Sequence, residues 1–529
     1  MSKLSTLLSL TDSGRTNTPL TFRQELPYRA VAFLSGAILG LSAPGFEQSY
    51  LAWFGLMPIL YLAVTARDPW YAGVRGWFFA MAYFLVYQNF YLFFRPEFGL
   101  GPFSQCPAFV SFFFWTTMSA WQALFFSIFI CVLRAVPMRN GWLPACHQGR
   151  WYFPAFLVVP FLYVLIDKMC NSPLLFGVPW ASLEYSQYKQ TALIQIASVI
   201  GGVGLGAVIV LANVVLLGLL SFRIRALKEF SYNSIASMLL NTTVALSLIF
   251  ALPVFGIWRL ETQKNSTAKK YTVSAVQGCL STVIHKVDSV KILDKHISLT
   301  EECPKDGLCV WPEWSLISNF TKNRDVIDMV AKFPPQRNQT WVVGLLDTDE
   351  KGCEYNSVCA FDRTGKICQP IYHKRYLVPF GEFTPDWVKE TPIGFLMYGP
   401  NHKYTDTTPD SKVVVFDCSD MKIGSMLCFE CVLPKLSTDS VKSGAQLLVD
   451  CSNMGWFYPS ILMDQMHAFC TMRAVENHRA FVFSTLLGPS AIFDSVGRKM
   501  CDAPVEKPAH ISAEVTLETD TTPFTRLSF

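Results

Sequence analysis

The stretch Gly424-Ser-Met-Leu-Cys-Phe-Glu430 decides how the second half of this 529-residue chain is interpreted. Two short runs with β character, 413–416 and 423–427, precede Cys428 and predict that the thiol lies where a strand ends. Rigid scaffolds usually present nucleophiles at strand ends. We therefore expect a nucleophilic thiol here, with the carboxylate of Glu430 beside it.

Two other stretches place a charged group just past a predicted strand. Val310-Trp-Pro-Glu313 ends in a carboxylate, and Tyr372-His-Lys-Arg-Tyr-Leu-Val-Pro-Phe-Gly-Glu382 carries the ammonium group of Lys374. A thiol, an ammonium and a carboxylate at separate strand ends can supply a nucleophile, an oxyanion stabiliser and a general base. Each residue taken singly also has a structural interpretation: a surface charge, a helix cap, a basic cluster or half of a disulfide.

The composition separates the chain into two parts. Hydrophobic residues make up 51% of it, which is too apolar for a purely soluble protein, and most charges lie after residue 258. The formal net charge of +4 gives no reason to expect nucleic-acid binding. From residue 271, short β-branched runs alternate with helical ones, which predicts a layered α/β domain. We expect a membrane part first and an α/β domain second.

The membrane part contains about seven apolar runs that predict spanning helices, with no cleavable signal peptide before them. The runs are 30–43, 51–64, 77–94, 107–133, 152–166, 193–220 and 235–257. The loops that carry most cations define the cytoplasmic side. Those cations are Arg15, Arg23, Arg29, Arg67, Arg75, Arg134, Arg139, Arg150, Arg223, Arg225 and Lys228. An odd number of spans then places everything after Arg259 on the outer side.

Two further features of this part have alternative interpretations. The aromatic segment 177–187, which includes Trp180 and Tyr185, suits either an anchor at the headgroup level or a re-entrant wall buried in protein. Gly201, Gly202 and Gly204 indicate either close helix packing or a hinge.

The motifs together resemble the nitrilase (carbon–nitrogen hydrolase) superfamily, fused to a membrane domain as in the apolipoprotein N-acyltransferases. The stretches that carry the resemblance are Leu41-Ser-Ala-Pro44, Val276-Gln-Gly278, Trp311-Pro-Glu313, Leu377-Val-Pro-Phe-Gly-Glu382, Cys428-Phe-Glu430 and Arg473-Ala-Val-Glu-Asn-His-Arg479. The resemblance implies an αββα sandwich after the α-helical multi-span domain. It also implies that Cys428 is the nucleophile, Glu313 the general base and Lys374 the oxyanion stabiliser.

The same resemblance implies the substrates. The thiol would take an acyl chain from a phospholipid, typically phosphatidylethanolamine, and pass it through a thioester to the N-terminal amine of a diacylglyceryl-cysteine apolipoprotein. We expect a monomer in the bacterial inner membrane with its catalytic domain in the periplasm, and no cofactor or metal. Glu382, Glu430 and Phe429 would support the site. Trp456, Phe457, Tyr185 and Trp180 are candidates for substrate binding.

These interpretations divide the chain into four parts: a cytoplasmic segment 1–28, a membrane domain 29–258, a nitrilase-like domain 259–515 and a polar tail 516–529 without a closing span. Phe429 departs from the family, in which a tyrosine often follows the nucleophile. Two other functions stay open: a membrane-tethered amidase or nitrile hydrolase of the same superfamily, and a non-catalytic lipoprotein-binding protein.

The chain has 16 cysteines, and an oxidising compartment would permit disulfides among them. The close spacings predict possible bonds between Cys303 and Cys309 and between Cys353 and Cys359. Cys428 and Cys431 form a Cys-x-x-Cys pattern, which without a second ligand pair is weak evidence for redox or metal chemistry.

Overall fold

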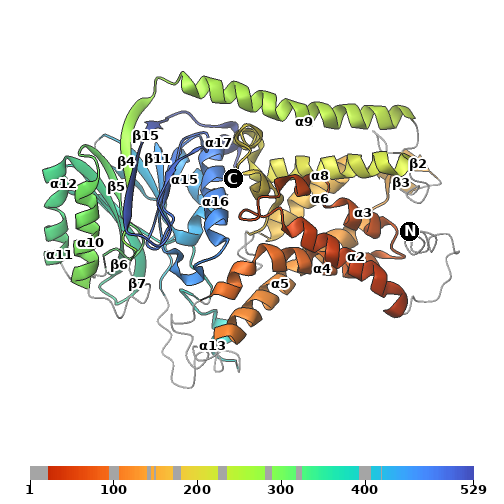
Figure 1. The fold of residues 1–529 in the computed structure, drawn as a ribbon, viewed down its shortest axis with the longest axis horizontal. Helices are drawn as coiled ribbons and strands as arrows, with labels where there is room; N and C mark the ends of the chain where they lie inside the picture. Colours follow the sequence, from red (N-terminus) through yellow and green to blue (C-terminus); the bar gives the residue numbers. More distant parts are fainter. Residues whose placement is uncertain are drawn as a thin grey trace. The chain divides into compact units, whose positions relative to one another are not determined.

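The computed structural model describes residues 22–94, 107–139, 145–147, 150–170, 180–223, 235–279, 289–316, 324–379, 381–391, 407–418 and 420–528. The chain divides into two compact units. One comprises Met1–Asn89, Phe113–Leu193 and Gly202–Phe255, and the other comprises Phe90–Phe112, Ile194–Gly201 and Gly256–Phe529. The described part of the first unit is mainly helical, whereas the second is built on β-sheets (Figure 1).

Every apolar run expected to span a membrane contains helix. The helices are α2 (Phe22–Gly40), α3 (Met57–Val64), α4 (Pro69–Tyr87), α5 (Pro107–Ala135), α6 (Ala155–Cys170), α8 (Ala197–Arg223) and α9 (Ile235–Lys264). Within the described residues, three helical stretches are long and apolar enough to cross a membrane: Ala108–Ala135, Ala197–Ser221 and Ile235–Lys264. Residues 152–154, expected in a span, lie instead in strand β3 (Arg150–Pro154).

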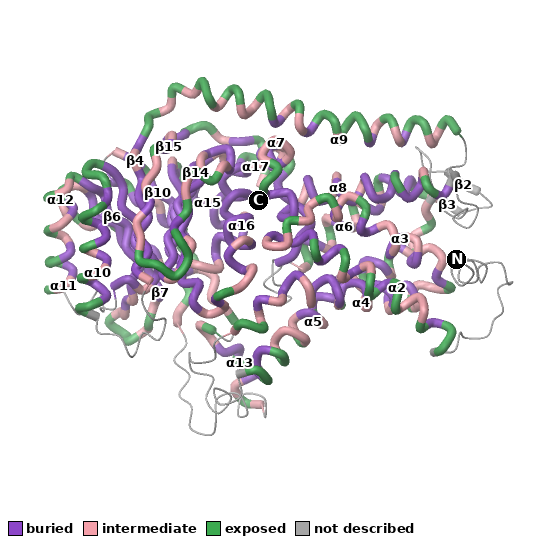
Figure 2. Tube along the Cα trace, viewed as in Figure 1, coloured by how far each residue is buried: buried purple, intermediate pink, exposed green. Residues whose placement is uncertain are grey.

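Helix α9 shows the environment that these helices require. Most of its residues are exposed (Figure 2), and the exposed side chains include Leu239, Leu246, Phe250 and Ile257. Contiguous exposed apolar surface of this size is unfavourable in water and favourable in hydrocarbon. The chain is therefore a membrane protein.

Arg75 was expected in a cytoplasmic loop, but it does not lie in a loop. It lies within α4, where its guanidinium is 2.8 Å from the Glu25 carboxylate and donates to the Leu62 carbonyl oxygen at 2.9 Å. Both charged side chains are buried, and a buried charge is tolerated when it is paired and hydrogen-bonded. Arg75 thus joins α2 to α4 rather than marking a membrane side.

Helix α8 is interrupted at Gly201, whose φ of 72° and ψ of 169° are not helical. A Cβ at this glycine would lie 2.5 Å from the ring of Phe524 in α17 (Pro523–Leu527). The absence of a side chain therefore permits a close approach, and the positive φ favours glycine as well. This agrees with the packing interpretation of Gly201, although its neighbour is α17.

The second unit contains two six-stranded sheets, as the predicted αββα sandwich requires. The first has the order β15-β4-β5-β6-β7-β8 and the second β14-β13-β12-β11-β10-β9. Their bounds are β4 (Lys269–Gln277), β5 (Gly307–Val310), β6 (Gln339–Thr348), β7 (Glu354–Phe361), β8 (Ile367–His373), β9 (Val415–Asp417), β10 (Lys422–Leu427), β11 (Leu447–Ser452), β12 (Ala480–Thr485), β13 (Ala491–Phe493), β14 (Lys499–Asp502) and β15 (Ala509–Leu517).

The core lies between the two sheets. One buried apolar cluster combines residues of both, including Val310 and Val342 from the first sheet and Ile423 and Val449 from the second. Helices cover the outer faces: α10 (Ser289–Glu302), α11 (Arg324–Val330) and α12 (Phe333–Arg337) on the first sheet, and α15 (Pro434–Lys442) and α16 (Leu462–Asn477) on the second (Figure 1). This layering buries the central strands on both faces, which explains their apolar sequences (Figure 2).

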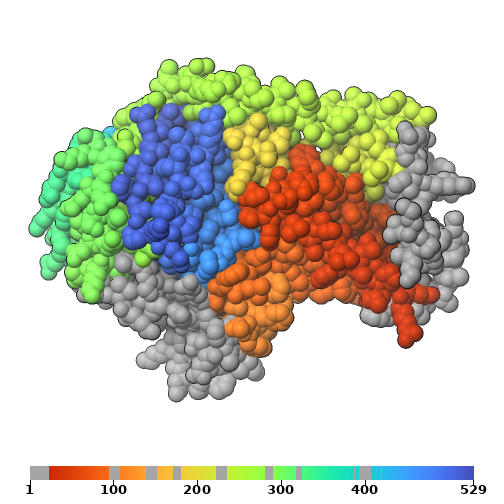
Figure 3. All heavy atoms as spheres, viewed as in Figure 1, coloured from red at the N-terminus to blue at the C-terminus, as the bar shows by residue number. Residues whose placement is uncertain are grey.

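The C-terminal residues complete the first sheet. Strand β15 runs antiparallel to β4 over nine pairs, from Ala509 opposite Gln277 to Leu517 opposite Lys269. Figure 3 shows these C-terminal residues, in blue, packed beside the green residues that begin the domain. Residues 516–529, predicted as a polar tail, therefore include the end of β15 and the short helix α17.

Candidate active site

Cys428 stands directly after β10, at the first residue of the 3-10 helix η9 (Cys428–Val432). Its φ of 54° is a left-handed conformation that non-glycine residues rarely adopt and that clusters at functional sites. The backbone N–H of Cys428 donates to Asp450 Oδ1 at 2.7 Å, in the neighbouring parallel strand β11. The strand end predicted from the sequence is therefore a sharp, hydrogen-bonded turn that carries the thiol.

Glu430 holds this turn against the end of β8. Its buried carboxylate accepts hydrogen bonds from the Leu427 N–H at 2.8 Å and the Arg375 N–H at 2.7 Å. It also accepts from the Tyr376 N–H at 3.0 Å and the Tyr372 hydroxyl at 2.5 Å. One carboxylate thus links the segment that contains Cys428 to the segment that follows Lys374.

We expect Glu430→Ala to destabilise the second unit by at least about 2 kcal/mol, because several buried donors lose their acceptor. The free energy of unfolding of the purified protein, measured by denaturant titration, tests this. Glu514→Ala is the matched control, since the ion pair of Glu514 with Lys270 is exposed, and it should change stability by less than about 0.5 kcal/mol. Equal stability of the two variants would contradict the role assigned to Glu430.

The side chains of Glu313 and Lys374 lie close to each other and to the Cys428 thiol. Lys374 follows β8 directly and is buried, with its Nζ 3.9 Å from Glu313 Oε1 and 2.8 Å from Glu382 Oε1. Glu313 accepts hydrogen bonds from the Cys428 thiol and from Asn356 Nδ2, the latter at 2.6 Å. The structure thus brings together the three side chains that the sequence had placed at separate strand ends.

Burial and charge set the protonation of this group. Burial, more than any other cause, raises the pKa of Glu313 to about 7, although the ammonium of Lys374 opposes the rise. Burial also raises the pKa of the Cys428 thiol to about 12. Burial lowers the pKa of Lys374, but the carboxylates of Glu382 and Glu313 outweigh it and the net direction is upward. The resting group is therefore a neutral thiol, an ammonium and a carboxyl group that titrates near neutral pH.

Two residues of the site were missed by the sequence argument. The side-chain amide of Asn356, on β7, donates to both Glu313 Oε1 and Glu382 Oε1, the second at 2.9 Å. The backbone carbonyl oxygen of Asn356 accepts from the Lys374 backbone N–H at 2.8 Å. Asp450 is a buried carboxylate in β11, directly after the apolar run Leu447 to Val449. The signal available in the sequence was a polar residue within a strand buried on both faces.

The aromatic candidates Trp456 and Phe457 lie in η10 (Met454–Phe457), just beyond the end of β11. The Phe457 ring contacts Phe90, Tyr91 and Phe94 with centroids 5.4, 5.6 and 5.3 Å apart, and Trp456 stacks on Phe94 at 6.3 Å. This aromatic cluster therefore includes residues that follow Ser452 closely in the chain, and Ser452 hydrogen-bonds to the Cys428 thiol.

The comparisons with known proteins agree with both parts of the chain. Residues 272–521 match the family model described as carbon-nitrogen hydrolase, and residues 35–215 match the model described as apolipoprotein N-acyltransferase N-terminal domain. The chain belongs to the apolipoprotein N-acyltransferase family.

Relatives with that name match this chain over nearly its full length. The apolipoprotein N-acyltransferase of Geobacter metallireducens is 28% identical over 505 residues, which cover 92% of this chain and 89% of the relative. That of Vibrio cholerae is 24% identical over 519 residues and 94% of each chain. A solved carbon-nitrogen hydrolase from Helicobacter pylori covers 47% of this chain and 89% of its own, with 17% identity and a TM-score of 0.38.

The remaining residues predicted to support the site or bind substrate lie in different parts of the chain. Phe429 is half-buried in η9 beside the thiol. Trp180 and Tyr185 belong to the first unit, where both are buried and the Tyr83 hydroxyl donates to the Ala181 carbonyl oxygen at 2.7 Å. An anchor at the headgroup level would be exposed, so the described part of the segment, from Trp180 on, fits the buried alternative. Residues 177–179 lie outside the described residues.

Neither of the two possible disulfides is formed in the structure, where Cys303, Cys309, Cys353 and Cys359 are free thiols. Cys303 and Cys309 are nevertheless hydrogen-bonded to each other. Cys359 lies in β7 and Cys353 just before it, and an extended strand separates residues six apart by about 20 Å. Cys428 and Cys431 are also free.

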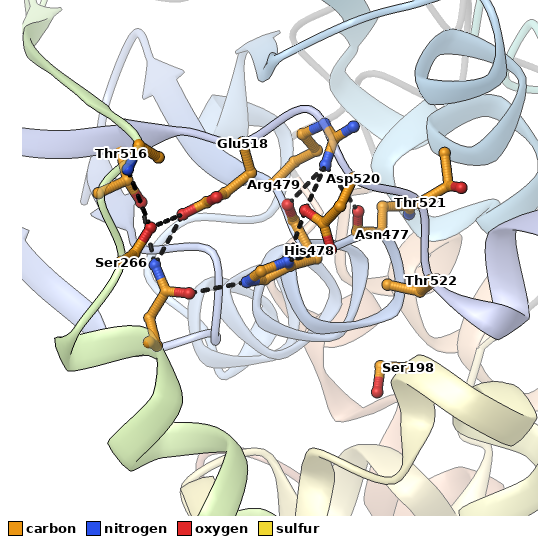
Figure 4. Close-up of polar contacts among 12 residues, drawn as sticks. Ser198, Ser266, Asn477, His478, Arg479, Thr516, Glu518, Asp520, Thr521 and Thr522 are labelled. Atoms are coloured by element: carbon orange, nitrogen blue, oxygen red, sulfur yellow. Dashed lines mark hydrogen bonds and ion pairs between the residues drawn. The ribbon is translucent and has the colours of Figure 1, made fainter.

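One group of side chains in the described residues has the spacing of a metal site. Ligand atoms of His478, Glu518 and Asp520 lie within 4.8 Å of one another (Figure 4). They are already engaged: His478 Nδ1 lies 3.0 Å from Asp520, its Nε2 lies 2.8 Å from Gln263 Oε1, and Gln263 Nε2 donates to Glu518 at 2.8 Å. The cation Arg479 lies 3.9 Å from Asp520 as well. These contacts join the C-terminal end of α16, α9 and the C-terminal segment.

Proposed function

We propose that this protein is a phospholipid:apolipoprotein N-acyltransferase with Glu313, Lys374 and Cys428 as its catalytic residues. The acyl donor is a membrane phospholipid such as phosphatidylethanolamine, and the acceptor is the N-terminal amine of a diacylglyceryl-cysteine apolipoprotein. The observation that carries the proposal is the contact of the three side chains in a chain that also holds membrane helices.

In the first half-reaction, Cys428 Sγ attacks the carbonyl carbon of the phospholipid ester while Glu313 takes the thiol proton. A C–S bond forms, and the negative charge that develops on the carbonyl oxygen is stabilised by the Lys374 ammonium. The ester C–O bond then breaks. Glu313 returns its proton to the leaving glyceryl oxygen, so the products are a lysophospholipid and an acyl thioester on Cys428.

In the second half-reaction, the apolipoprotein amine attacks the thioester carbonyl and Glu313 takes a proton from the nitrogen. The C–N bond forms, the C–S bond breaks and the thiol regains the proton from Glu313. The neutral resting thiol suits this cycle, because the same carboxylate moves the proton in both directions.

The membrane helices support the choice of lipid substrates. An apolar acyl chain needs an apolar path to the thiol, and the cluster of Trp456 and Phe457 with Phe94 offers an apolar surface near Ser452. Tyr185 and Trp180 stay candidates for substrate contact from the first unit. We place residues 29–258 in the bacterial inner membrane and residues 259–515 in the periplasm, and we expect a monomer.

The acylation rate should depend on the ionisation of Glu313. A base must be deprotonated, and the pKa of Glu313 is about 7. We therefore expect the single-turnover rate of acyl-enzyme formation to rise about tenfold per pH unit below pH 7 and to level off above it. A rate that is flat between pH 5 and pH 8 would contradict this role. Continued tenfold rises above pH 8 would indicate deprotonation of the thiol by solvent instead.

The proposal is tested with the purified protein in mixed micelles, supplied with a phospholipid that carries a fluorescent sn-1 acyl chain and with a synthetic diacylglyceryl-cysteine peptide. Transfer of the fluorophore to the peptide amine, dependent on both substrates, is the expected result. Ammonia release from small amides without lipid dependence would favour the amidase alternative. Peptide binding without any transfer would favour the non-catalytic one.

A further inference from the structure

Two buried cysteines far apart in the sequence lie unusually close together. Both are free thiols in this structure, with Cys368 Sγ and Cys418 Sγ 3.0 Å apart, which is about 1 Å longer than a disulfide bond. Both side chains belong to the apolar cluster between the two sheets. A movement of the sulfurs by about 1 Å would therefore bring them to bonding distance.

The two cysteines lie at edges of the two sheets that are next to each other. Cys368 is the second residue of β8, the edge strand of the first sheet, and pairs with Ala360 of β7. Cys418 follows β9, the edge strand of the second sheet, and its N–H donates to the Met421 carbonyl oxygen at 3.0 Å. Both cysteines are thus held on rigid, hydrogen-bonded backbone.

We infer that Cys368 and Cys418 form a disulfide that fastens β8 of the first sheet to the β9–β10 turn of the second. The inference rests on the proposed periplasmic placement of the domain, because disulfides persist in oxidising compartments. The two thiols lose two protons and two electrons as the S–S bond forms. The electrons reduce the disulfide of an oxidised thiol–disulfide exchange protein to two thiols.

The bond would act on the candidate active site through the chain that it closes. Lys374 lies six residues after Cys368, and Glu382 lies in the same closed loop, which ends at Cys418. On the other side of the disulfide, Cys418 is followed in the chain by β10, which ends directly before Cys428. The disulfide therefore constrains the segment that presents Lys374 relative to the strand that presents the thiol.

Peptide mapping of the full-length protein tests the inference. Protein isolated without reductant from bacterial membranes is alkylated under denaturing conditions, digested and analysed by mass spectrometry. The expected result is a cross-linked peptide containing Cys368 and Cys418. Absence of this peptide, both as isolated and after incubation with oxidised glutathione, would overturn the inference. A cross-link that forms only with oxidised glutathione would support the pairing and count against the periplasmic placement.

Thermal unfolding gives a second readout. A reductant should lower the apparent midpoint of the wild-type protein by roughly 5–15 °C, and the double variant Cys368→Ala/Cys418→Ala should lose that response. Cys359→Ala, at a buried cysteine in a different core cluster, should keep it. An equal response of wild type and double variant would contradict the proposed bond.

Discussion

Cys428→Ser should abolish the hydroxylamine-sensitive acyl-enzyme and slow acyl transfer by about a thousandfold or more. A serine hydroxyl is a far weaker nucleophile than a thiol, and Glu313, with a pKa of about 7, is a poor base for it. Serine preserves the size of the side chain, so the left-handed turn and the bond from the Cys428 N–H to Asp450 should persist. The measurement is the transfer of a fluorescent acyl chain to the acceptor peptide.

Cys501→Ser is the matched control, because Cys501 is a half-exposed free cysteine on β14, at the opposite edge of the sheet from β9 and β10. It should retain wild-type transfer. If Cys428→Ser kept more than about a tenth of the wild-type rate while its thermal unfolding was unchanged, Cys428 could not be the nucleophile.

Glu313→Gln should slow both half-reactions by roughly 100- to 10,000-fold. The amide keeps the shape and the oxygen that accepts from Asn356, but it cannot take the thiol proton or the amine proton. Binding of the phospholipid should change little. The rates of acyl-enzyme formation and of its aminolysis, each measured in a single turnover, report the two steps separately.

Glu382→Gln distinguishes the base from a supporting carboxylate. Glu382 lies 2.8 Å from Lys374 Nζ and accepts from the Val378 N–H, also at 2.8 Å. Its amide variant should lose less activity than Glu313→Gln and should shift the pH profile downward, because one negative charge beside Glu313 is gone and that charge raises the pKa of Glu313. A larger loss in Glu382→Gln than in Glu313→Gln would reverse the two roles.

The sequence predicted the layers of the second unit because strands buried on both faces leave apolar runs. Strands β9 and β10 were expected at 413–416 and 423–427, close to where they lie, and a strand end was expected before Lys374, whereas β7 was not predicted. Strand β8 reads Ile-Cys-Gln-Pro-Ile-Tyr-His, without a regular alternation, since it is an edge strand with a partly solvated surface. Its bounds depended on pairing with β7, which no local pattern reveals.

The candidate site was predictable as three strand ends but not as a network. Glu313, Lys374 and Cys428 carry recognisable chemistry in recognisable motifs. Asn356 and Asp450 belong to no recognisable motif, and their roles depend on which strands become neighbours. The same limit applies to the cysteines, because spacing singled out Cys303 with Cys309 but could not reveal that the sulfurs of Cys368 and Cys418 lie 3.0 Å apart across two sheets.

The most direct test of the proposed mechanism is to locate the acyl group on the protein. The full-length protein is incubated with phospholipid in the absence of acceptor, denatured in acid, digested and analysed by tandem mass spectrometry. The fragment ions should place one acyl chain on Cys428 and none on Cys431, and hydroxylamine should remove it. An acyl group on any other residue, or no acyl group while transfer still proceeds when acceptor is added, would contradict the mechanism.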